Sequence, residues 1–233
     1  MICTLTTARV RIGHSGAVVS RVLGAVLVGG ASSRFGTDKA SASLGQRTML
    51  QQQLATLAAA GVVKRVYVGG EPRPEISEAR HLADVYPGEG PFGAIVTTLA
   101  EALRLSNDAQ ATDVIVALAV DVPLVTPSTI NRLIAELVTN DAGTTNEEAL
   151  TNEEALTNDA AVAYGERTHW SCLAVRTAAH HALHAAFTQG ERAIHRAFSS
   201  LRVARVACSE TELLNVNDLS ALNVITAQRD ERR

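Results

Sequence analysis

The segment 114–120 constrains the fold of this chain more than any other feature. It is apolar at every position and lacks the alternation of a strand that has one face in water. A continuous apolar run of this length is typical of a central parallel strand covered on both faces. Residues 22–28 have the same character and end at Gly29-Gly30. The two runs predict an open parallel sheet with further layers packed on both sides.

Helix signals fall between the strand signals. Thr48 precedes a helical pattern that ends at Gly61, and Thr126-Pro127 opens another helix with Thr at the N-cap and Pro at N1. The other expected strands are 65–68, a short one ending near Asp84, 160–164, 171–175 and 203–207, and the other expected helices are 95–103, 178–187 and one capped by Asn217. Strands that alternate with helices predict the α/β class, here a three-layer αβα sandwich around a Rossmann-like, mostly parallel sheet.

Chain length and one repeat set the expected domain organisation. A chain of 233 residues is close to the upper limit for one hydrophobic core, so we expect a single domain over residues 21–227. The sequence Thr-Asn-Glu-Glu-Ala-Leu occurs twice in succession at 145–156. Its Glu-Glu pairs predict a flexible, solvated insertion over residues 140–159. Residues 1–20 and 228–233 are expected to be disordered tails.

Composition excludes several classes of function. The net charge of -3 offers no broad basic surface for nucleic acid. No apolar run approaches the roughly 20 residues of a membrane helix, and the first twenty residues lack the continuous apolar segment of a signal peptide. The three cysteines are far apart and show neither metal-ligand nor redox spacing. We therefore expect a cytoplasmic protein with reduced thiols that binds neither nucleic acid nor membranes.

The segment 27–39 has the composition of a polyphosphate site. Two glycines directly after a strand let the backbone approach a ligand, and the exposed N–H groups of such a turn bind anions. Two serines add hydroxyl donors, and an arginine and a lysine add the cations that phosphates need. The candidate residues are Leu27, Val28, Gly29, Gly30, Ser32, Ser33, Arg34 and Lys39. The spacing is neither that of a Walker P-loop nor Gly-x-Gly-x-x-Gly, so a dinucleotide-binding dehydrogenase is poorly supported.

Asp121 follows the apolar run 114–120 and is the candidate metal ligand. Ligands of open α/β sheets bind beyond the carboxyl ends of the strands, and Mg²⁺ is usually held by one or two carboxylates together with phosphate oxygens. The alternative is a structural role for Asp121 at the start of an Asp-x-Pro turn. Lys39 is one of only two lysines in the chain, which suggests a site for a compact ammonium group. Asp84, taken alone, is typical of a turn residue before Pro87.

Several of these segments together resemble one family. Leu27-x-Gly-Gly-x-Ser-x-Arg-Phe-Gly-x-Asp-Lys39 is similar to the signature of the molybdenum cofactor guanylyltransferases of the MobA type. The stretch from Asp84 through Gly90-Pro-Phe-Gly to Ile95, the segment Ala119-Val-Asp121-Val-Pro123, the residues 169–176 and the turn Asn215-Val-Asn217 follow in the family's order. The chain departs from the pattern after its second strand, where Gly69-Gly70 lacks the Asn or Ser often found there.

The resemblance implies a nucleotide-diphospho-sugar-transferase-like fold and a reaction in which GMP passes from GTP to the terminal phosphate of molybdenum-molybdopterin. It implies Mg²⁺ as the cofactor, Lys39, Arg34 and Asp121 as the catalytic groups, and a nucleotide or metal contact for Asp84. Molybdoenzymes or cofactor-delivery proteins are the further partners it suggests. A phosphate nucleophile is already ionised at neutral pH, so positioning and charge neutralisation suffice without a general base.

Two other interpretations stay open on the sequence alone. One is a related nucleotidyltransferase that uses CTP on the same pterin or joins a nucleotide to a sugar phosphate, since nothing in the physics of the sequence selects the base. The other is a catalytically silent nucleotide-binding module, against which the presence of both Lys39 and Asp121 argues.

Overall fold

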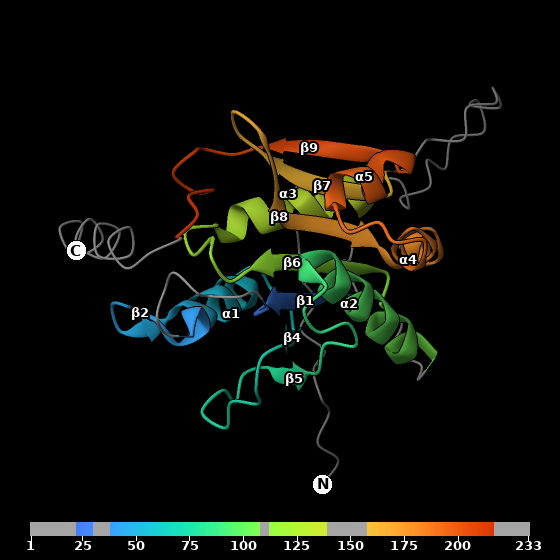
Figure 1. The fold of residues 1–233 in the computed structure, drawn as a ribbon. Coiled ribbons are helices and arrows are strands. Elements are labelled where there is room, and N and C mark those ends of the chain that lie inside the picture. Colours follow the sequence, from blue (N-terminus) through green and yellow to red (C-terminus); the bar gives the residue numbers. More distant parts are fainter. Residues whose placement is uncertain (1–21, 30–37, 108–111, 139–157, 217–233) are drawn as a thin grey trace, which may run out of the picture.

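A seven-stranded sheet forms the centre of the structure, a computed structural model that describes residues 22–29, 38–107, 112–138 and 158–216. The strand order is β5-β4-β1-β6-β8-β7-β9, which runs from bottom to top in Figure 1. The strands are β1 (Val22–Leu27), β4 (Lys64–Val68), β5 (Arg80–Leu82), β6 (Val114–Ala119), β7 (Ala160–Tyr164), β8 (Thr168–Arg176) and β9 (Val203–Ala207). Among them only β8 runs against the others, because it pairs antiparallel with both β6 and β7. The predicted mostly parallel sheet is confirmed.

Helices cover both faces of this sheet (Figure 1). The main helices are α1 (Met49–Ala59) and α3 (Pro127–Val138) on one face, and α2 (Gly90–Asn107) and α4 (His180–Thr188) on the other. Two separate apolar clusters result, one with the side chains of α1 and α3 and one with those of α2 and α4. The predicted three-layer αβα sandwich is therefore confirmed. None of the described helices is long and apolar enough to span a membrane.

The two clusters explain why the strand sequences are apolar without alternation. In β1, Val26 points into the cluster under α1 and α3, whereas Leu23, Ala25 and Leu27 belong to the cluster under α2 and α4. Successive side chains of a strand point to opposite faces of the sheet. With both faces buried, no position of β1 gains from being polar.

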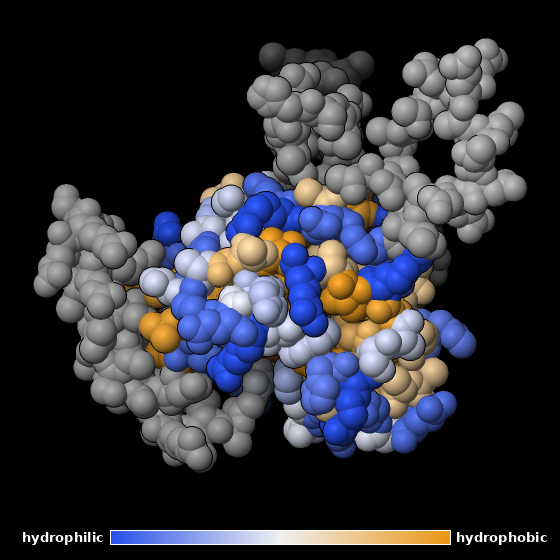
Figure 2. Space-filling view, turned by 90° about the horizontal axis from the view of Figure 1, so that it is seen from above, coloured by the Kyte–Doolittle hydropathy of each residue, from blue (hydrophilic) through white to orange (hydrophobic). Residues whose placement is uncertain are grey.

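Short elements complete the fold around this core. A two-stranded hairpin, β2 (Ser43–Leu44) and β3 (Arg47–Thr48), precedes α1, and the short helix α5 (Ile194–Ala197) precedes β9. Thr48 caps α1 through a capping box with Gln51, as its place before the helix predicts. On the face seen from above, Figure 2 shows hydrophilic and hydrophobic residues interspersed over the coloured part of the surface.

The structure corrects the predicted elements at several places, and the short helix α5 was not predicted. α2 begins at Gly90 rather than at residue 95, because the missing N–H of Pro91 costs nothing in the first turn of a helix. The β2–β3 hairpin was not predicted, since two-residue strands carry no periodicity. β8 is longer than predicted and extends over Thr168–Arg176.

Some predictions fall on other parts of the chain. The expected tails 1–20 and 228–233, the helix after Asn217, and the insertion 140–159 apart from its last two residues lie outside the described residues. The single domain over 21–227 stays a prediction.

Candidate active site

The carboxyl ends of three neighbouring parallel strands lie level at one edge of the sheet. Leu27 of β1 is paired with Val68 of β4 on one side and with Ala119 of β6 on the other. The segments that follow these strands therefore emerge side by side, and two of them carry predicted site residues, Gly29 and Asp121. In open α/β sheets this edge is where ligands bind.

An ion pair joins two predicted site residues at this edge. Lys39 Nζ lies 3.6 Å from Asp121 Oδ2, and the two side chains keep 17% and 26% of their surface exposed. The pair is thus partly shielded from water yet open to a ligand. Asp121 Oδ1 is buried and has no hydrogen-bond partner among the described residues. A buried carboxylate oxygen without a partner is costly, so it marks a place where a cation or a donor is expected.

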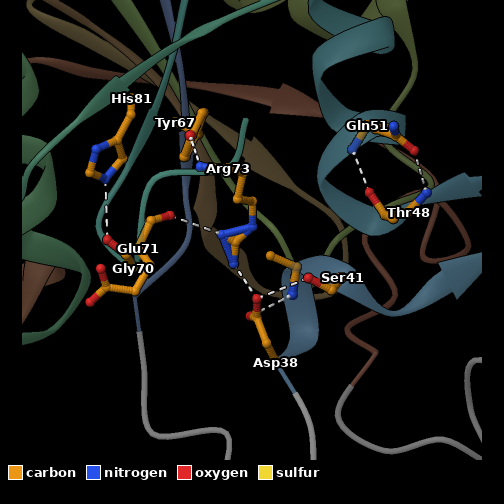
Figure 3. Close-up of polar contacts among 10 residues, drawn as sticks. Asp38, Ser41, Thr48, Gln51, Tyr67, Gly70, Glu71, Arg73 and His81 are labelled. Carbon is orange, nitrogen blue, oxygen red and sulfur yellow. Dashed lines mark hydrogen bonds and ion pairs between the residues drawn. The ribbon is translucent and has the colours of Figure 1, made fainter. Parts of the chain in front are cut away.

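Lys39 is held in place through its neighbour Asp38, whose contacts with Ser41 and Arg73 are drawn in Figure 3. Asp38 caps the one-turn 3₁₀ helix Lys39–Ser41: it accepts from Ala40 N at 3.1 Å and from Ser41 Oγ at 3.1 Å. Asp38 Oδ2 also pairs with the guanidinium of Arg73, which comes from the loop after β4. The Arg73 side chain is only 10% exposed, and Arg73 N donates to Tyr67 Oη at 2.7 Å. The Lys39 turn is therefore tied to the loop of a neighbouring strand.

The turn that carries Asp121 is held from several elements. Val122 N donates to Ala119 O at 3.3 Å, and Val120 N donates to Leu27 O at 3.1 Å. Val216 N donates to Asp121 O at 2.7 Å, which brings residues 209–216, here called the C-terminal segment, against this turn. The backbone of Asp121 is thus fixed from β1 and from the segment before residue 217.

Asn215 lies beside the same turn, because its neighbour Val216 bonds to Asp121. Asn215 Oδ1 is buried and has no hydrogen-bond partner within the described ranges. Glu212 holds the segment that carries Asn215: its Oε1 accepts from Thr126 Oγ1 at 2.6 Å and from Thr129 Oγ1 at 2.9 Å. Burial raises the pKa of the Glu212 carboxyl, but these hydrogen bonds and those from Ser209 outweigh burial and hold that pKa below its usual value.

A second group of predicted residues meets around Gly69. Gly69 has a φ of 84°, and a Cβ built on it would lie 3.6 Å from Gly29 N and 3.9 Å from Asp84 Cβ. Val28 N donates to Val68 O at 2.9 Å, which keeps the two strand ends together. Main-chain groups of Gly29 and Gly69, with the Asp84 side chain beside them, form this side of the site.

Asp84 also performs the structural role expected of an isolated turn residue. Its Oδ1 accepts from Tyr86 N at 3.0 Å and from Thr97 Oγ1 at 3.0 Å. These bonds fix the turn that leads into α2. Four candidate phosphate contacts, Gly30, Ser32, Ser33 and Arg34, lie outside the described residues.

The described residues contain no group of three or more His, Cys, Asp or Glu side chains that suits a metal ion. A cation at Asp121 would take its other ligands from amide oxygens, from substrate or from water. This combination is what Mg²⁺ accepts, since it keeps several waters and uses few protein carboxylates.

The sequence from residue 24 to residue 206 matches the MobA-like NTP transferase domain. The chain belongs to this family. The match includes most of β1 together with Lys39, Asp84 and Asp121, so these parts of the candidate site lie within a MobA-like NTP transferase domain.

Individual relatives agree with this assignment. The molybdenum cofactor guanylyltransferase of Xanthomonas euvesicatoria pv. vesicatoria (strain 85-10) is 38% identical over 112 residues, which are 48% of this chain and 53% of that protein. The chain thus spans about half the length of the curated relatives it matches. The similar solved structures include molybdopterin-guanine dinucleotide biosynthesis protein A from Archaeoglobus fulgidus, with a TM-score of 0.66 and 20% identity over 90% of this chain and 99% of that chain. They also include 2-C-methyl-D-erythritol 4-phosphate cytidylyltransferase from Thermus thermophilus, with a TM-score of 0.57 and 17% identity over 88% and 98%. At these identities the structural likenesses show the fold alone.

Sequence reasoning did not assign a role to several residues that support this site, among them Arg73, Gly69, Gln53 and Glu212. Arg73 stands in a loop and gives no periodic signal, and Gly69 was noted only as a departure from the family pattern. Gln53 did leave a signal, because it is a polar residue on the apolar stripe of α1 that carries Leu50, Leu54 and Leu57.

Proposed function

We propose that this chain transfers GMP from GTP to the terminal phosphate of molybdenum-molybdopterin and releases pyrophosphate. The observation that supports it most is the Lys39–Asp121 pair at the carboxyl edge of the sheet, with Asp121 Oδ1 buried and unpartnered among the described residues. The Xanthomonas relative is a molybdenum cofactor guanylyltransferase, which supports guanine as the base and the molybdenum cofactor as the acceptor. An acceptor phosphate oxygen bonds to the α-phosphorus of GTP, and the bond from that phosphorus to the bridging oxygen of the β-phosphate breaks.

Lys39 and Asp121 have complementary roles in this proposal. Lys39 places a compact positive charge where the phosphates of GTP lie, and the Asp38 cap with its Arg73 partner fixes the backbone from which Lys39 extends. Asp121 supplies a negative charge that holds a divalent cation. The incoming phosphate is already an anion, so the chain needs no residue to remove a proton.

The donor set suits Mg²⁺. Asp121 Oδ1 is a carboxylate oxygen and Asn215 Oδ1 an amide oxygen, both are buried without a partner in the described parts of the chain, and both come from the two segments joined by Val216 N. Hard oxygen donors of this kind are those that Mg²⁺ prefers. A bound Mg²⁺ supplies charge neutralisation on the triphosphate oxygens.

The remaining contacts follow the edge of the sheet. The residues proposed to bind the nucleotide are Leu27, Val28, Gly29, Gly30, Ser32, Ser33, Lys39, Asp84 and Asp121, with Arg34 as a further catalytic cation. On the Gly69 side neither Gly29 nor Gly69 carries a side chain, so nucleotide contacts there use main-chain groups beside the Asp84 side chain. Molybdoenzymes or delivery proteins would receive the product.

Thermal unfolding with each of the four nucleoside triphosphates and Mg²⁺ tests the proposal. A ligand at about 100 times its Kd adds about 2.7 kcal/mol to the free energy of unfolding, which raises the melting temperature by roughly 5–10 °C for a chain of this size. We expect GTP to give the largest rise and pyrophosphate release to require the molybdopterin acceptor. Equal rises with all four nucleotides would refute the guanine assignment, and a larger rise with CTP would favour a cytidylyltransferase.

A further inference from the structure

Gln53 is a fully buried polar side chain on the core face of α1. Its exposure is 0%, and it stands among Leu50, Leu54 and Leu57, which are equally buried. An amide in such a position is unfavourable unless its polar atoms find partners. An apolar residue would continue the stripe, so the glutamine needs an explanation outside the packing of α1 itself.

The partners of Gln53 lie on the turn that carries Asp121. Gln53 Nε2 donates to Ala119 O at 3.3 Å and to Val122 O at 2.6 Å. Ala119 and Val122 are the first and last residues of this turn, because Val122 N donates to Ala119 O at 3.3 Å. An amide nitrogen carries two protons. One side chain of α1 therefore joins both ends of the turn.

Only the donor half of the Gln53 amide is used. Gln53 Oε1 is buried and has no hydrogen-bond partner among the residues described. The side chain thus satisfies carbonyl groups of the turn rather than contributing an acceptor. Val122 O has one further donor, Val125 N at 3.4 Å, which is longer than the contact from Gln53.

Asp121 lies between the two carbonyls that Gln53 binds. Its own carbonyl accepts from Val216 N at 2.7 Å, and Val120 N donates to Leu27 O at 3.1 Å. With Gln53 as the third support, the main chain on both sides of Asp121 is fixed by α1, β1 and the C-terminal segment. The Asp121 carboxylate extends from this fixed backbone, and its Oδ2 lies 3.6 Å from Lys39 Nζ.

We propose that Gln53 is a positioning residue for the divalent cation that Asp121 holds. The inference rests on the proposed function, since it takes Asp121 as the cation ligand. Gln53 acts through the turn: it keeps Asp121 Oδ1 aimed at the cation before the cation binds. Residues that orient a metal ligand in this way typically change metal affinity or activity by about 10–100-fold when they are replaced.

The test compares Gln53→Met with Gln52→Met. Methionine keeps the length of glutamine and removes both donors. Gln52 lies next to Gln53 on the same helix, and among the described residues its Nε2 donates to Thr56 Oγ1 of α1 at 3.4 Å. Binding of Mn²⁺ in the presence of GTP, followed by electron paramagnetic resonance, should be about tenfold weaker or more in Gln53→Met and unchanged in Gln52→Met. Amide hydrogen exchange of residues 119–125 in the free protein should be faster only in Gln53→Met.

Steady-state kinetics separate positioning from a merely structural role. In Gln53→Met we expect a higher Mg²⁺ requirement, with the KM for GTP at saturating Mg²⁺ within about twofold of the wild type. A lower melting temperature with unchanged Mn²⁺ affinity would overturn the inference. Absence of Mn²⁺ binding in the wild type would overturn the proposed function, whereas equal binding by the wild type and Gln53→Met would overturn the role of Gln53 alone.

The wild-type protein gives a second test, should Gln53→Met fail to fold. Addition of Mg²⁺ and GTP should shift the side-chain amide resonances of Gln53 and leave those of Gln52 in place, because only the first is bonded to the Asp121 turn. Gln53 resonances that do not respond would overturn the inference.

Discussion

The Lys39–Asp121 side of the candidate site and its Gly29–Gly69 side lie at the ends of adjacent strands but are built differently. On the first side, opposite charges 3.6 Å apart are held by caps, by the Gln53 amide and by the C-terminal segment. On the second side, two backbone segments approach so closely that a Cβ on Gly69 would touch Gly29.

The contrast shows two ways of preparing a binding site. A charged side chain stabilises a transition state most when it is held in a fixed position. Hydrogen bonds from several elements hold the first side in this way. A backbone surface needs little support beyond the strands themselves, but the φ of 84° at Gly69 disfavours any residue with a Cβ there. Replacing a charge should therefore affect the first side most, and adding a methyl group should affect the second.

The largest effect is expected for Asp121→Asn. The change keeps the size of the side chain and removes the charge proposed to hold the cation. Transfer should fall by about 1,000-fold, which corresponds to several kcal/mol of lost transition-state stabilisation, while the protein stays folded. Pyrophosphate release beside circular dichroism measures both. Asp113→Asn, at the other end of β6, is the matched control and should keep full activity; normal turnover by Asp121→Asn would leave Asp121 as a turn residue only.

Lys39→Ala should give the next largest effect. The loss of one charged contact to a phosphate costs about 1.5–3 kcal/mol, or roughly 10–100-fold in transfer. Lys39→Arg should restore only part of this, because a planar fork replaces a point charge in the turn capped by Asp38. Lys64→Ala removes the only other lysine, at the start of β4, and should have no effect on transfer. Full activity of Lys39→Arg would show that any cation suffices there.

The two sides also differ in how far the sequence predicts them. Lys39 and Asp121 were both proposed from residue type and position after a strand, and the structure brings them together across 82 positions. Strand pairing explains why predicted site residues meet there, since parallel strands end at one edge; their roles stay predictions. The role of Gln53 could be found only from the structure. Its polar character is visible in the sequence, but its partners 66 and 69 residues away are not.

The glycine side was predicted only in part. Gly29 was proposed for its flexibility, yet its neighbour in space, Gly69, comes from a different strand loop. No periodicity links two such loops, and a positive φ at Gly69 appears only in the folded chain. The fold class could be predicted because apolar runs reflect burial of a strand on both faces. The start of α2 could not, because it depends on how a single turn closes at Gly90.

Gly69→Ala should have a moderate effect on GTP binding, through the Gly29–Gly69 side of the site. Alanine at a φ of 84° is strained by about 1–2 kcal/mol, and its methyl group would cover the strand ends beside Gly29. We expect a lower melting temperature and several-fold weaker GTP binding. Gly45→Ala, at a φ of 66° in the β2–β3 turn with no atom within 4 Å of the added Cβ, also places alanine at a positive φ but away from the site. It should lower stability alone; if it weakens GTP binding equally, the Gly69 effect is one of stability.

The smallest effect is expected from Glu212, which supports the Asp121 side only. Glu212 accepts from Thr126 and Thr129, and its hydrogen bonds hold its pKa below the usual value against the opposing effect of burial. A carboxyl group with a lowered pKa in the folded state stabilises the protein above its unfolded pKa of about 4.3. This stabilisation is lost as the pH falls from there through the lowered folded pKa.

Glu212→Gln should therefore be less stable than the wild type at pH 7, and the difference should shrink as the pH falls below about 4.3. Urea unfolding at several pH values measures it. Because Glu212 holds the segment whose Val216 N bonds to Asp121 O, the variant should also bind Mn²⁺ more weakly at pH 7 while its affinity for GTP without a cation stays unchanged. Equal loss of both affinities would mean that the C-terminal segment supports the glycine side as well, and the proposed division of the site into two independently built sides would be wrong.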